Sequence, residues 1–402
     1  TIIPNLLTAN RSVICIDPKG ENARIAGRAR QAFGPVYVLD PFDVTGFRSS
    51  AFNPLDAIDI GGLDAADDAN ALADAIVFDE PGMAGEAHWN EEAKALIAGL
   101  ILKIVAHESI GRSNLATLRE YLTLPTEHFA ALLKRMQESS EAHGLIARAA
   151  NRHLGKSDRE AAGVLSAAQR HTHFLDSPRI QRVLDDSYFS FADLKKNNAT
   201  VFLVLPPDRL ATYSRWLRLL LTQSLTEMAR APARPEQPVL YLLDEFAALG
   251  HRAPVERAMG LMAGYGVQLW PILQDIHQLR DTYGKRAGTF LSNAGVLQVF
   301  GVNDLESSRL ISDLLGQETV VFQTVSHAID AEETGLTFSE QYTGRPLMTP
   351  DEVRNLPKEV ELLFLAGQRP IVAAKLAYYA NAEFAGLTMP PEQGPRDKIQ
   401  AS

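Results

Sequence analysis

The sequence has one cysteine, Cys15, in 402 residues. A disulfide framework is therefore excluded, and the chain suits a reducing compartment. Long hydrophobic runs are also missing: the best candidate, AGLILKIVA from Ala98, is far shorter than the roughly 20 apolar residues that span a bilayer, and it contains Lys103. We therefore expect this chain, as given, to be soluble, with Cys15 packed in a strand.

The first residues, TIIPNLL, include no initiator methionine and none of the basic, apolar and small-residue zones of a signal peptide. We therefore expect the natural start of the protein to lie upstream.

Basic residues are outnumbered, and the formal net charge is −10. The excess lies in one block from Asp56 to Glu92, which holds eleven Asp or Glu and no Lys or Arg. An acidic balance argues against a protein that coats duplex DNA non-specifically, although a local basic groove remains possible. The block itself is either a solvated helix face or a docking surface for a basic partner.

The composition, 46% hydrophobic and 22% charged, is that of a globular protein with a large core, and the length suggests two or three domains. Short runs that are apolar on both faces alternate with helical patterns, which predicts an α/β fold with a mostly parallel, doubly wound sheet. The runs are SVICID, PVYVLD, ATVFLVL, PVLYLLD, GVQLWPIL and GVLQVFG.

Helical periodicity fills the region between the second and third of these runs, with Asn114 and Thr126 as candidate helix starts. We interpret residues 59–186 as an all-α domain inserted into an α/β domain formed by residues 1–58 and 187–389. Two α/β halves joined by long helices are the alternative. Past Gly316 the sequence is polar and irregular, then two apolar runs, VELLFLAG and RPIVAAKLAYY, suit late, partly edge strands. We expect residues 390–402 to be a disordered tail.

The stretch VLYLLDEFAALG runs from a buried strand straight into two acids, Asp244 and Glu245. In nucleoside triphosphate hydrolysis the first acid of such a pair holds magnesium through its water shell, and the second accepts a proton from the attacking water or orients it. Strand-end acids also cap the following helix, so the pair alone is a weak signal.

A second strand, GVQLWPIL, precedes Gln274, thirty residues after Asp244, with a helix between the two strands. In a parallel sheet such a unit brings Asp244, Glu245 and Gln274 to one carboxyl edge, where ligands bind. A glutamine there senses the γ-phosphate or positions water; the alternative is an exposed loop start.

A phosphate cradle, G-x-x-x-x-G-K-[ST], is missing from the sequence. LGKS at Leu154 has Ala150 in place of the first glycine, inside a helical pattern. YGKR at Tyr283 has Leu279 in that place and Arg286 after the lysine. Neither is suited to wrap backbone N–H groups around a phosphate.

The sequence resembles the coupling ATPases of type IV secretion and conjugation, the TraG/TraD-like coupling proteins. The resemblance rests on IIPNLL, SVICIDPKGE, VLDPFD, SSAFNPLD, LLDEFAALG, ILQDIHQLRDTYG, FLSNAGVLQVFGVND and RPLMTPDEVRNLP, which follow in order over nearly the whole chain. It implies a RecA-like P-loop NTPase core, with the family's helical domain where we place the insertion.

The resemblance also implies that this chain is a fragment starting just after the phosphate-binding loop, with two membrane helices upstream. The intact protein would then sit at the cytoplasmic face of a bacterial inner membrane. We expect the 402 residues alone to hydrolyse ATP negligibly, which a magnesium-dependent turnover assay measures.

A homo-hexameric ATPase that uses ATP and Mg²⁺ is the motor implied by the resemblance. It would receive relaxase-bound single-stranded DNA, and in some cases secreted proteins, and pass them to the secretion channel. The motifs carry over Asp244 for magnesium and Glu245 and Gln274 for catalysis. Asp17, Lys19 and Glu21 of the DPKGE turn match a family signature for nucleotide binding, with a structural turn as the alternative.

Some relatives carry an arginine just before the sensor strand, but here that segment reads LMAGYGV. Arg252, Arg257 and Arg209 are the remaining candidates for an arginine that reaches a neighbour's phosphates. In the helical segment, basic residues between Lys134 and Arg170 could contact a phosphate backbone or form a solvated face. His171 and His173 would sit on different sides of a helix, which disfavours a metal site.

Two rival functions stay open. One is a protein-effector receptor of a type IV secretion system with no DNA role, and the other is a non-catalytic module that docks cargo through its helical domain.

Overall fold

The computed structural model describes residues 2–78, 87–249, 253–327 and 336–388. The chain divides into two compact units. The first combines Thr1–Ile272 with Tyr378–Ser402, and the second is Leu273–Ala377.

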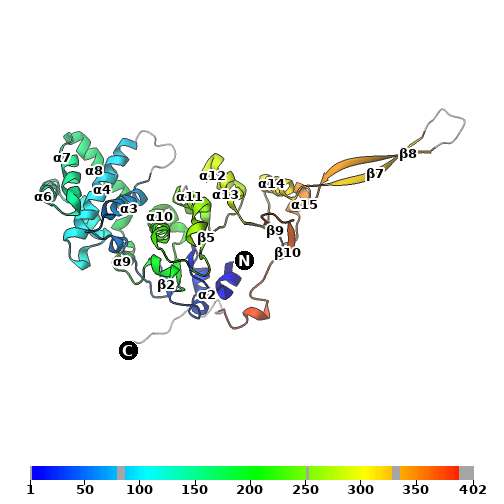
Figure 1. Cartoon of the computed structure of the whole chain (residues 1–402), viewed down its shortest axis with the longest axis horizontal. Coiled ribbons are helices and arrows are strands. Elements are labelled where there is room, and N and C mark those ends of the chain that lie inside the picture. The colour runs from blue at the N-terminus through cyan, green and yellow to red at the C-terminus, as the bar shows by residue number, and fades with distance from the viewer. Residues whose placement is uncertain (1, 79–86, 250–252, 328–335, 389–402) are drawn as a thin grey trace. The chain divides into compact units, whose positions relative to one another are not determined.

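A five-stranded parallel sheet in the order β2-β3-β1-β4-β5 lies in the first unit (Figure 1). Every residue of β1, β3 and β4 is buried, as expected for strands covered by helices on both faces. Five of the six apolar runs predicted as sheet strands are found here, so the predicted α/β class is confirmed. The strands are β1 (Val13–Ile16), β2 (Val36–Leu39), β3 (Thr200–Leu203), β4 (Val239–Leu243) and β5 (Val267–Pro271).

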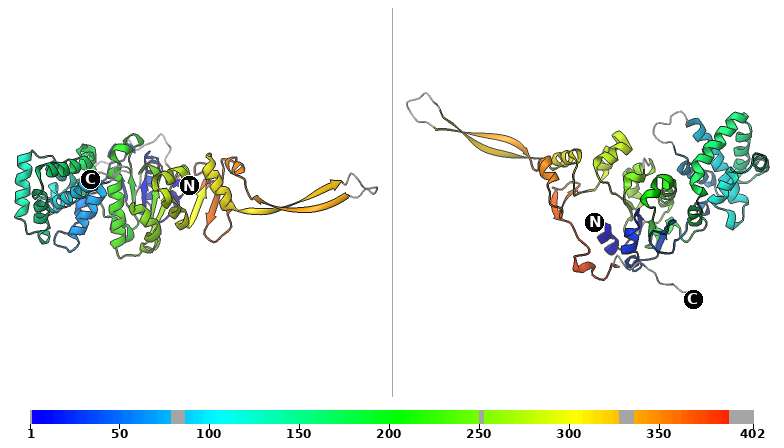
Figure 2. Two further views of the ribbon diagram at one scale, coloured as in Figure 1. Left: turned by 90° about the horizontal axis from the view of Figure 1, so that it is seen from above. Right: turned by 180° about the vertical axis from the view of Figure 1, so that it is seen from behind.

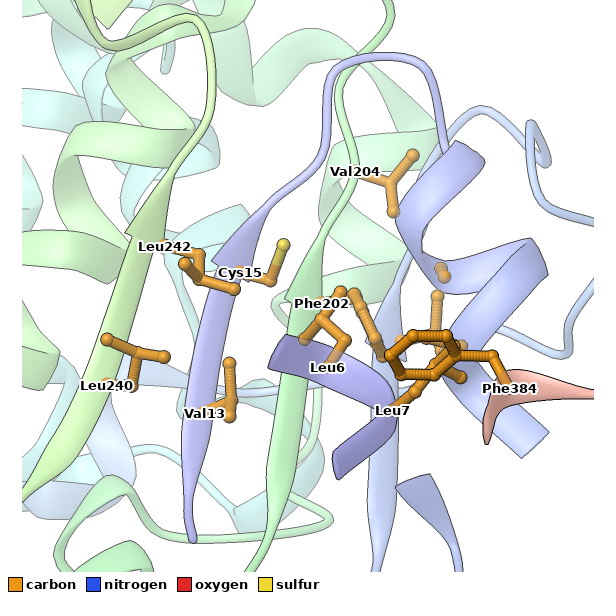
Figure 3. Close-up of a cluster of buried hydrophobic side chains, with 12 residues drawn as sticks. Leu6, Leu7, Val13, Cys15, Phe202, Val204, Leu240, Leu242 and Phe384 are labelled. Carbon is orange, nitrogen blue, oxygen red and sulfur yellow. The ribbon is translucent and has the colours of Figure 1, made fainter. Parts of the chain in front are cut away.

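One face of this sheet packs against two short helices, α1 (Ile2–Thr8) and α2 (Glu21–Arg30). Leu6 and Leu7 of α1 join a buried cluster with strand side chains that include Cys15 and Phe202 (Figure 3). Cys15 is fully buried, which confirms its predicted packing. Because side chains alternate along a strand, the residues next to Cys15 in β1 and next to Phe202 in β3 point to the opposite face of the sheet.

The described residues between Ala65 and Val183 form helices with no strand between them, in line with the helical periodicity of this region (Figure 2). Asn114 caps α5 by accepting the Thr117 N–H at 3.1 Å, and Thr126 is the first residue of α6, so both predicted helix starts are confirmed. No helix in the described ranges is both long and apolar enough to cross a bilayer. The helices are α3 (Ala65–Ile76), α4 (Ala87–His107), α5 (Leu115–Leu122), α6 (Thr126–Gln137), α7 (Leu145–Leu154), α8 (Asp158–Thr172) and α9 (Pro178–Val183).

The helical segment is tied to the α/β part through α10 (Pro207–Arg230), which follows β3. Arg218 of α10 donates to the carbonyls of Asp74 and Val77, at 2.7 and 3.0 Å, and so satisfies backbone groups at the end of α3. Arg230 at the end of α10 pairs with Asp68 of α3. Asp68 of the acidic block therefore pairs with an arginine of the chain itself.

Glu92 of α4 is the centre of an ion-pair network inside the helical segment. Its carboxylate accepts from Arg152 of α7 at 2.6 and 2.9 Å and from Lys156 at 2.9 Å. The hydrogen bonds from Arg152, and then those from Lys156, lower the pKa of Glu92 to about 2.

Replacing Glu92 by glutamine is expected to lower the free energy of unfolding at pH 7 by about 1–3 kcal/mol, because charge-assisted hydrogen bonds lose their charge. A depressed pKa contributes stability that is present above the unfolded value of 4.5 and is lost as pH falls toward 2. The difference in free energy of unfolding between wild type and Glu92→Gln, measured by urea unfolding, should therefore decrease as the pH falls from 4.5 toward 2. Glu91→Gln, at the exposed neighbouring position, is the control. A difference in free energy of unfolding that does not change with pH would contradict the lowered pKa of Glu92.

The second unit contains a separate three-stranded antiparallel sheet in the order β10-β9-β6. The prediction that Gly295–Gly301 joins the parallel sheet is wrong, because β6 (Val296–Val299) pairs with β9 (Val360–Leu365). An apolar run encodes a strand but not its partner, and here the partner lies some sixty residues away. The runs VELLFLAG and RPIVAAKLAYY do form strands, β9 and β10 (Ile371–Ala374).

A long two-stranded ribbon, which we did not predict, follows Gly316, where the sequence is polar and irregular (Figure 1). Strands β7 (Gln317–His327) and β8 (Leu336–Pro346) pair antiparallel over eleven residues each. Val321, Phe322 and Tyr342 are all more than 40% exposed. Over residues 317–324 and 339–346, whose burial is described, the ribbon has no buried face that would give its sequence a regular alternation of apolar and polar residues.

The predicted disordered tail, residues 390–402, lies outside the described residues.

The remaining α-helices are short and lie between β4 and β9 in the chain. The helices are α11 (Ala253–Leu261), α12 (Ile276–Tyr283), α13 (Ala287–Asn293), α14 (Leu305–Leu315) and α15 (Pro350–Arg354).

Candidate functional site

The carboxyl ends of β1 and β4 lie side by side, because Ile16 is opposite Leu243 in the parallel register. The residues that follow are Asp17 and Asp244, so the sheet brings these two acids to one edge. Strand β5 ends at the same edge: the Ile272 N–H donates to the Leu243 carbonyl at 3.0 Å. The carboxyl ends of β1, β4 and β5 therefore lie at one edge of the sheet, as predicted for β4 and β5.

Asp17 is almost fully buried, with 1% of its surface exposed. Its carboxylate accepts the Ala23 N–H at 2.8 Å, and its carbonyl accepts the Gly20 N–H at 3.2 Å. Burial raises the pKa of Asp17 to about 6, and the nearby charge of Asp244 adds to the increase, while the bonds from Ala23 and Asn22 oppose it. Asp17 thus holds the turn that opens α2.

Gly20 makes this turn possible. Its φ is +65°, and a Cβ would lie 2.9 Å from Cγ2 of Thr45 and 3.1 Å from Cγ1 of Val44. A side chain would therefore be both strained and crowded. Lys19 and Glu21 on either side are exposed, and the Lys19 carbonyl accepts from Arg24 at 3.2 Å.

Asn22 is the residue of this edge that the sequence analysis missed. It is 6% exposed, and the interaction of its side-chain amide with Asp244 lowers the pKa of that acid. The charge of Lys19 acts in the same direction. The sequence signal that could have indicated Asn22 is its position: it is the polar residue directly after DPKGE, in the first turn of α2.

Asp244 is half-buried, and burial raises its pKa, with the charge of Glu245 adding to the increase. The Glu245 N–H donates to Oδ1 of Asp244 at 3.1 Å. Glu245 has a φ of +51°, in the left-handed region that costs a non-glycine residue of order 1 kcal/mol. Strained residues of this kind cluster at functional sites.

The donor set at this edge fits magnesium. The pKa values of Asp17 and Asp244 are both raised, so these carboxylates gain from a nearby divalent cation. Mg²⁺ is usually bound by one or two carboxylates together with waters and substrate phosphates. Within the described ranges no group of three or more His, Cys, Asp or Glu residues gathers into a metal site. Asp244 is half-buried whereas Asp17 is buried, so Asp244 is the more accessible of the two to such an ion.

Gln274 follows β5 but belongs to the second unit. It is exposed, and its N–H donates to Oε1 of Gln278 at 3.1 Å. Its role as a sensor of the γ-phosphate remains a prediction.

The two segments that partly match the phosphate-binding motif, LGKS at Leu154 and YGKR at Tyr283, lie at helix ends and turns. Leu154 ends α7 and Lys156 precedes α8, where its ammonium pairs with Glu92 and Glu160, both at 2.9 Å. Tyr283 ends α12, and Gly284–Arg286 form one 3₁₀ turn. Neither segment is a loop between a strand and a helix.

Of the three candidate arginines, Arg252 lies outside the described residues, and so does the side chain of Arg257. Arg209, in the first turn of α10, is exposed. Its guanidinium lies 5.6 Å from the ring centre of Phe42 and 3.1 Å from the carboxylate of Asp208.

Comparison with known proteins gives consistent results. A family model described as type IV secretory system conjugative DNA transfer matches residues 1–399. The chain is 26% identical over 403 residues to the probable conjugal transfer protein TraG of Sinorhizobium fredii (strain NBRC 101917 / NGR234), covering 98% of this chain and 62% of that protein. It is 28% identical over 435 residues to the conjugal transfer protein TraG of Escherichia coli, covering 100% of this chain and 68% of that one.

Among solved structures, plasmid coupling protein TrwB in complex with ADP and Mg²⁺ superposes with a TM-score of 0.67 at 19% identity, over 92% of this chain and 79% of that one. The likeness confirms the predicted α/β fold class.

Proposed function

The chain belongs to the type IV secretory system conjugative DNA transfer family, and from this premise we propose that it is the motor part of a coupling protein that uses ATP to deliver DNA to a conjugation channel. The observation that carries the proposal is the acidic pair Asp244–Glu245 at the tip of buried β4, beside Asp17 and Asn22.

Asp244 and Glu245 have distinct roles in the proposed hydrolysis, and the role proposed for Gln274, in the second unit, rests on its sequence motif. Asp244 holds the magnesium of Mg·ATP through water, and Glu245 accepts a proton from the attacking water or orients it. Gln274 senses the γ-phosphate. The bound magnesium supplies charge that neutralises the phosphate oxygens.

The DPKGE turn supports the acidic pair. The side-chain amide of Asn22 and the charge of Lys19 both favour the ionised form of Asp244. Asp17 fixes the turn that presents both residues. Lys19 and Glu21 are exposed, so they are accessible to the nucleotide.

The phosphate cradle is not in this sequence, and the matched Sinorhizobium protein is longer, since the chain covers 62% of it. We propose that residues of the intact protein outside these 402 supply it. We further propose a homo-hexamer at the cytoplasmic face of the inner membrane, with relaxase-bound single-stranded DNA, secreted proteins and channel components as partners. Residues 59–186 would act as an inserted all-α domain and residues 1–58 with 187–389 as the nucleotide-binding domain.

Removing the gene from a donor strain and restoring it on a plasmid tests the function. We expect transfer of a mobilisable plasmid to fall to background on deletion and to return on complementation. In the purified full-length protein, single-stranded DNA should stimulate Mg²⁺-dependent ATP hydrolysis. Normal plasmid transfer after deletion, with loss of a secreted protein instead, would favour the protein-effector receptor.

A further inference from the structure

A cavity of about 460 Å³ opens at the carboxyl edge of the parallel sheet, away from the acidic pair. It lies beyond the ends of β2 and β3, whereas Asp244 follows β4, and β1 separates the two places in the sheet. The lining residues come from the loop after β2, the start of α9 and the start of α10. They are Phe42, Val44, Ser177, Arg179, Pro206, Asp208, Arg209 and Tyr213.

Aromatic rings and guanidinium groups meet in this cavity. The Phe42 ring lies 5.2 Å from the Tyr213 ring, centre to centre, at an interplanar angle of 50°. The guanidinium groups of Arg179 and Arg209 lie 6.0 and 5.6 Å from the centre of the Phe42 ring. Both rings are partly exposed, so part of each remains accessible to a ligand.

Both arginines pair with exposed acids, and Arg179 also donates to the Pro41 carbonyl at 3.2 Å. Arg179 pairs with Asp43 at 2.7 Å, and Arg209 pairs with Asp208 at 3.1 Å. All four side chains are about half or more exposed. Ion pairs in this setting contribute little to stability, so a phosphate could replace either carboxylate at small cost. Guanidinium groups bind phosphates through two parallel hydrogen bonds and also stack on planar rings.

We propose that this cavity binds one nucleotide unit of single-stranded DNA, with the base against Phe42 and Tyr213 and the flanking phosphates on Arg179 and Arg209. Stacking on aromatic side chains combined with cationic tracking of the backbone is how proteins hold single strands without sequence preference. A duplex keeps its base faces stacked and cannot use the rings. The cavity volume lies within the usual range of small-ligand pockets. The proposal rests on the proposed function, since it gives the transported strand a contact on the motor.

Binding of a fluorescent 20-nucleotide oligo-dT to the full-length protein, followed by anisotropy, tests the site. Phe42→Leu keeps the apolar bulk but loses the ring, and we expect it to weaken binding roughly five- to 100-fold. Arg209→Gln should weaken binding and reduce the slope of log K against log salt by about 0.7. Arg28→Gln, an exposed arginine at the last turn of α2, is the control and should bind as wild type. Melting curves confirm that each variant is folded.

Two further readouts separate a binding role from a structural one. Oligonucleotides that carry 5-iodouracil should crosslink to Phe42 or Tyr213, as mapped by mass spectrometry. Phe42→Leu should also lose stimulation of ATP hydrolysis by DNA while basal hydrolysis stays unchanged.

Wild-type affinity in both variants, with no crosslink at either ring, would overturn the proposal while leaving the proposed function intact. Competition by Mg·ATP alone would make the cavity a mononucleotide site and would also overturn it. Equal loss of duplex and single-strand binding in Phe42→Leu would remove the stacking role. A full-length protein that binds no DNA at all would instead refute the proposed function.

Discussion

Replacing Glu245 with glutamine in the full-length protein is expected to lower the rate of ATP hydrolysis at least about 100-fold, with nucleotide binding retained. Glutamine keeps the size of the side chain but cannot accept a proton from water. The N–H of residue 245 still donates to Asp244, so the turn is preserved. Hydrolysis by the purified protein and plasmid transfer from donor cells should fall together.

The electrostatics of the pair explain why binding should survive this change. The charge of Glu245 raises the pKa of Asp244, so its removal favours the ionised form of Asp244 that holds magnesium. Fluorescent ATP analogue binding in the presence of Mg²⁺ measures this directly. The control is Glu236→Gln, an exposed acid in the loop that precedes β4 at the opposite end of the strand. Near-normal hydrolysis in Glu245→Gln would remove Glu245 from its proposed role.

Replacing Arg30 with alanine is expected to lower the free energy of unfolding by about 3–5 kcal/mol. Arg30 is fully buried, and burial lowers its pKa to about 10, with the charge of Arg11 adding to the decrease. Its guanidinium donates to Thr200 Oγ1 at 2.8 Å and to the carbonyls of Leu6, Ala9 and Arg11. These bonds tie the end of α1 and the start of β3 to the last turn of α2.

Alanine would leave those carbonyls buried without a donor and would open a cavity at the base of the sheet. Urea unfolding of wild type and variant measures the loss as a shift in midpoint at constant slope. Arg28→Ala, on an exposed position of the same helix, should change the midpoint little. A loss below about 1 kcal/mol in Arg30→Ala would show that water takes over the hydrogen bonds.

Part of the candidate site could be predicted from the sequence because its strongest signal, an apolar run followed by two acids, involves only neighbouring residues. Five consecutive buried residues in β4 followed by two acids place those acids at a strand end whatever the neighbours are. The burial of Cys15 and the caps of the helical segment are local in the same sense. Asn22 was missed because its meaning depends on Asp244, more than two hundred residues away in the chain.

The amino-acid sequence by itself determined the α/β class, the all-helical stretch, and which residues stand at the tips of β1, β4 and β5, since periodicity and strand ends are written in neighbouring residues. Only the tertiary structure decided that β6 leaves the parallel sheet for β9, that β7 and β8 form a ribbon, and that Phe42 meets Arg179 and Tyr213. Strand pairing and contacts between distant loops depend on which surfaces bury each other, and that choice is made by the whole chain as it packs.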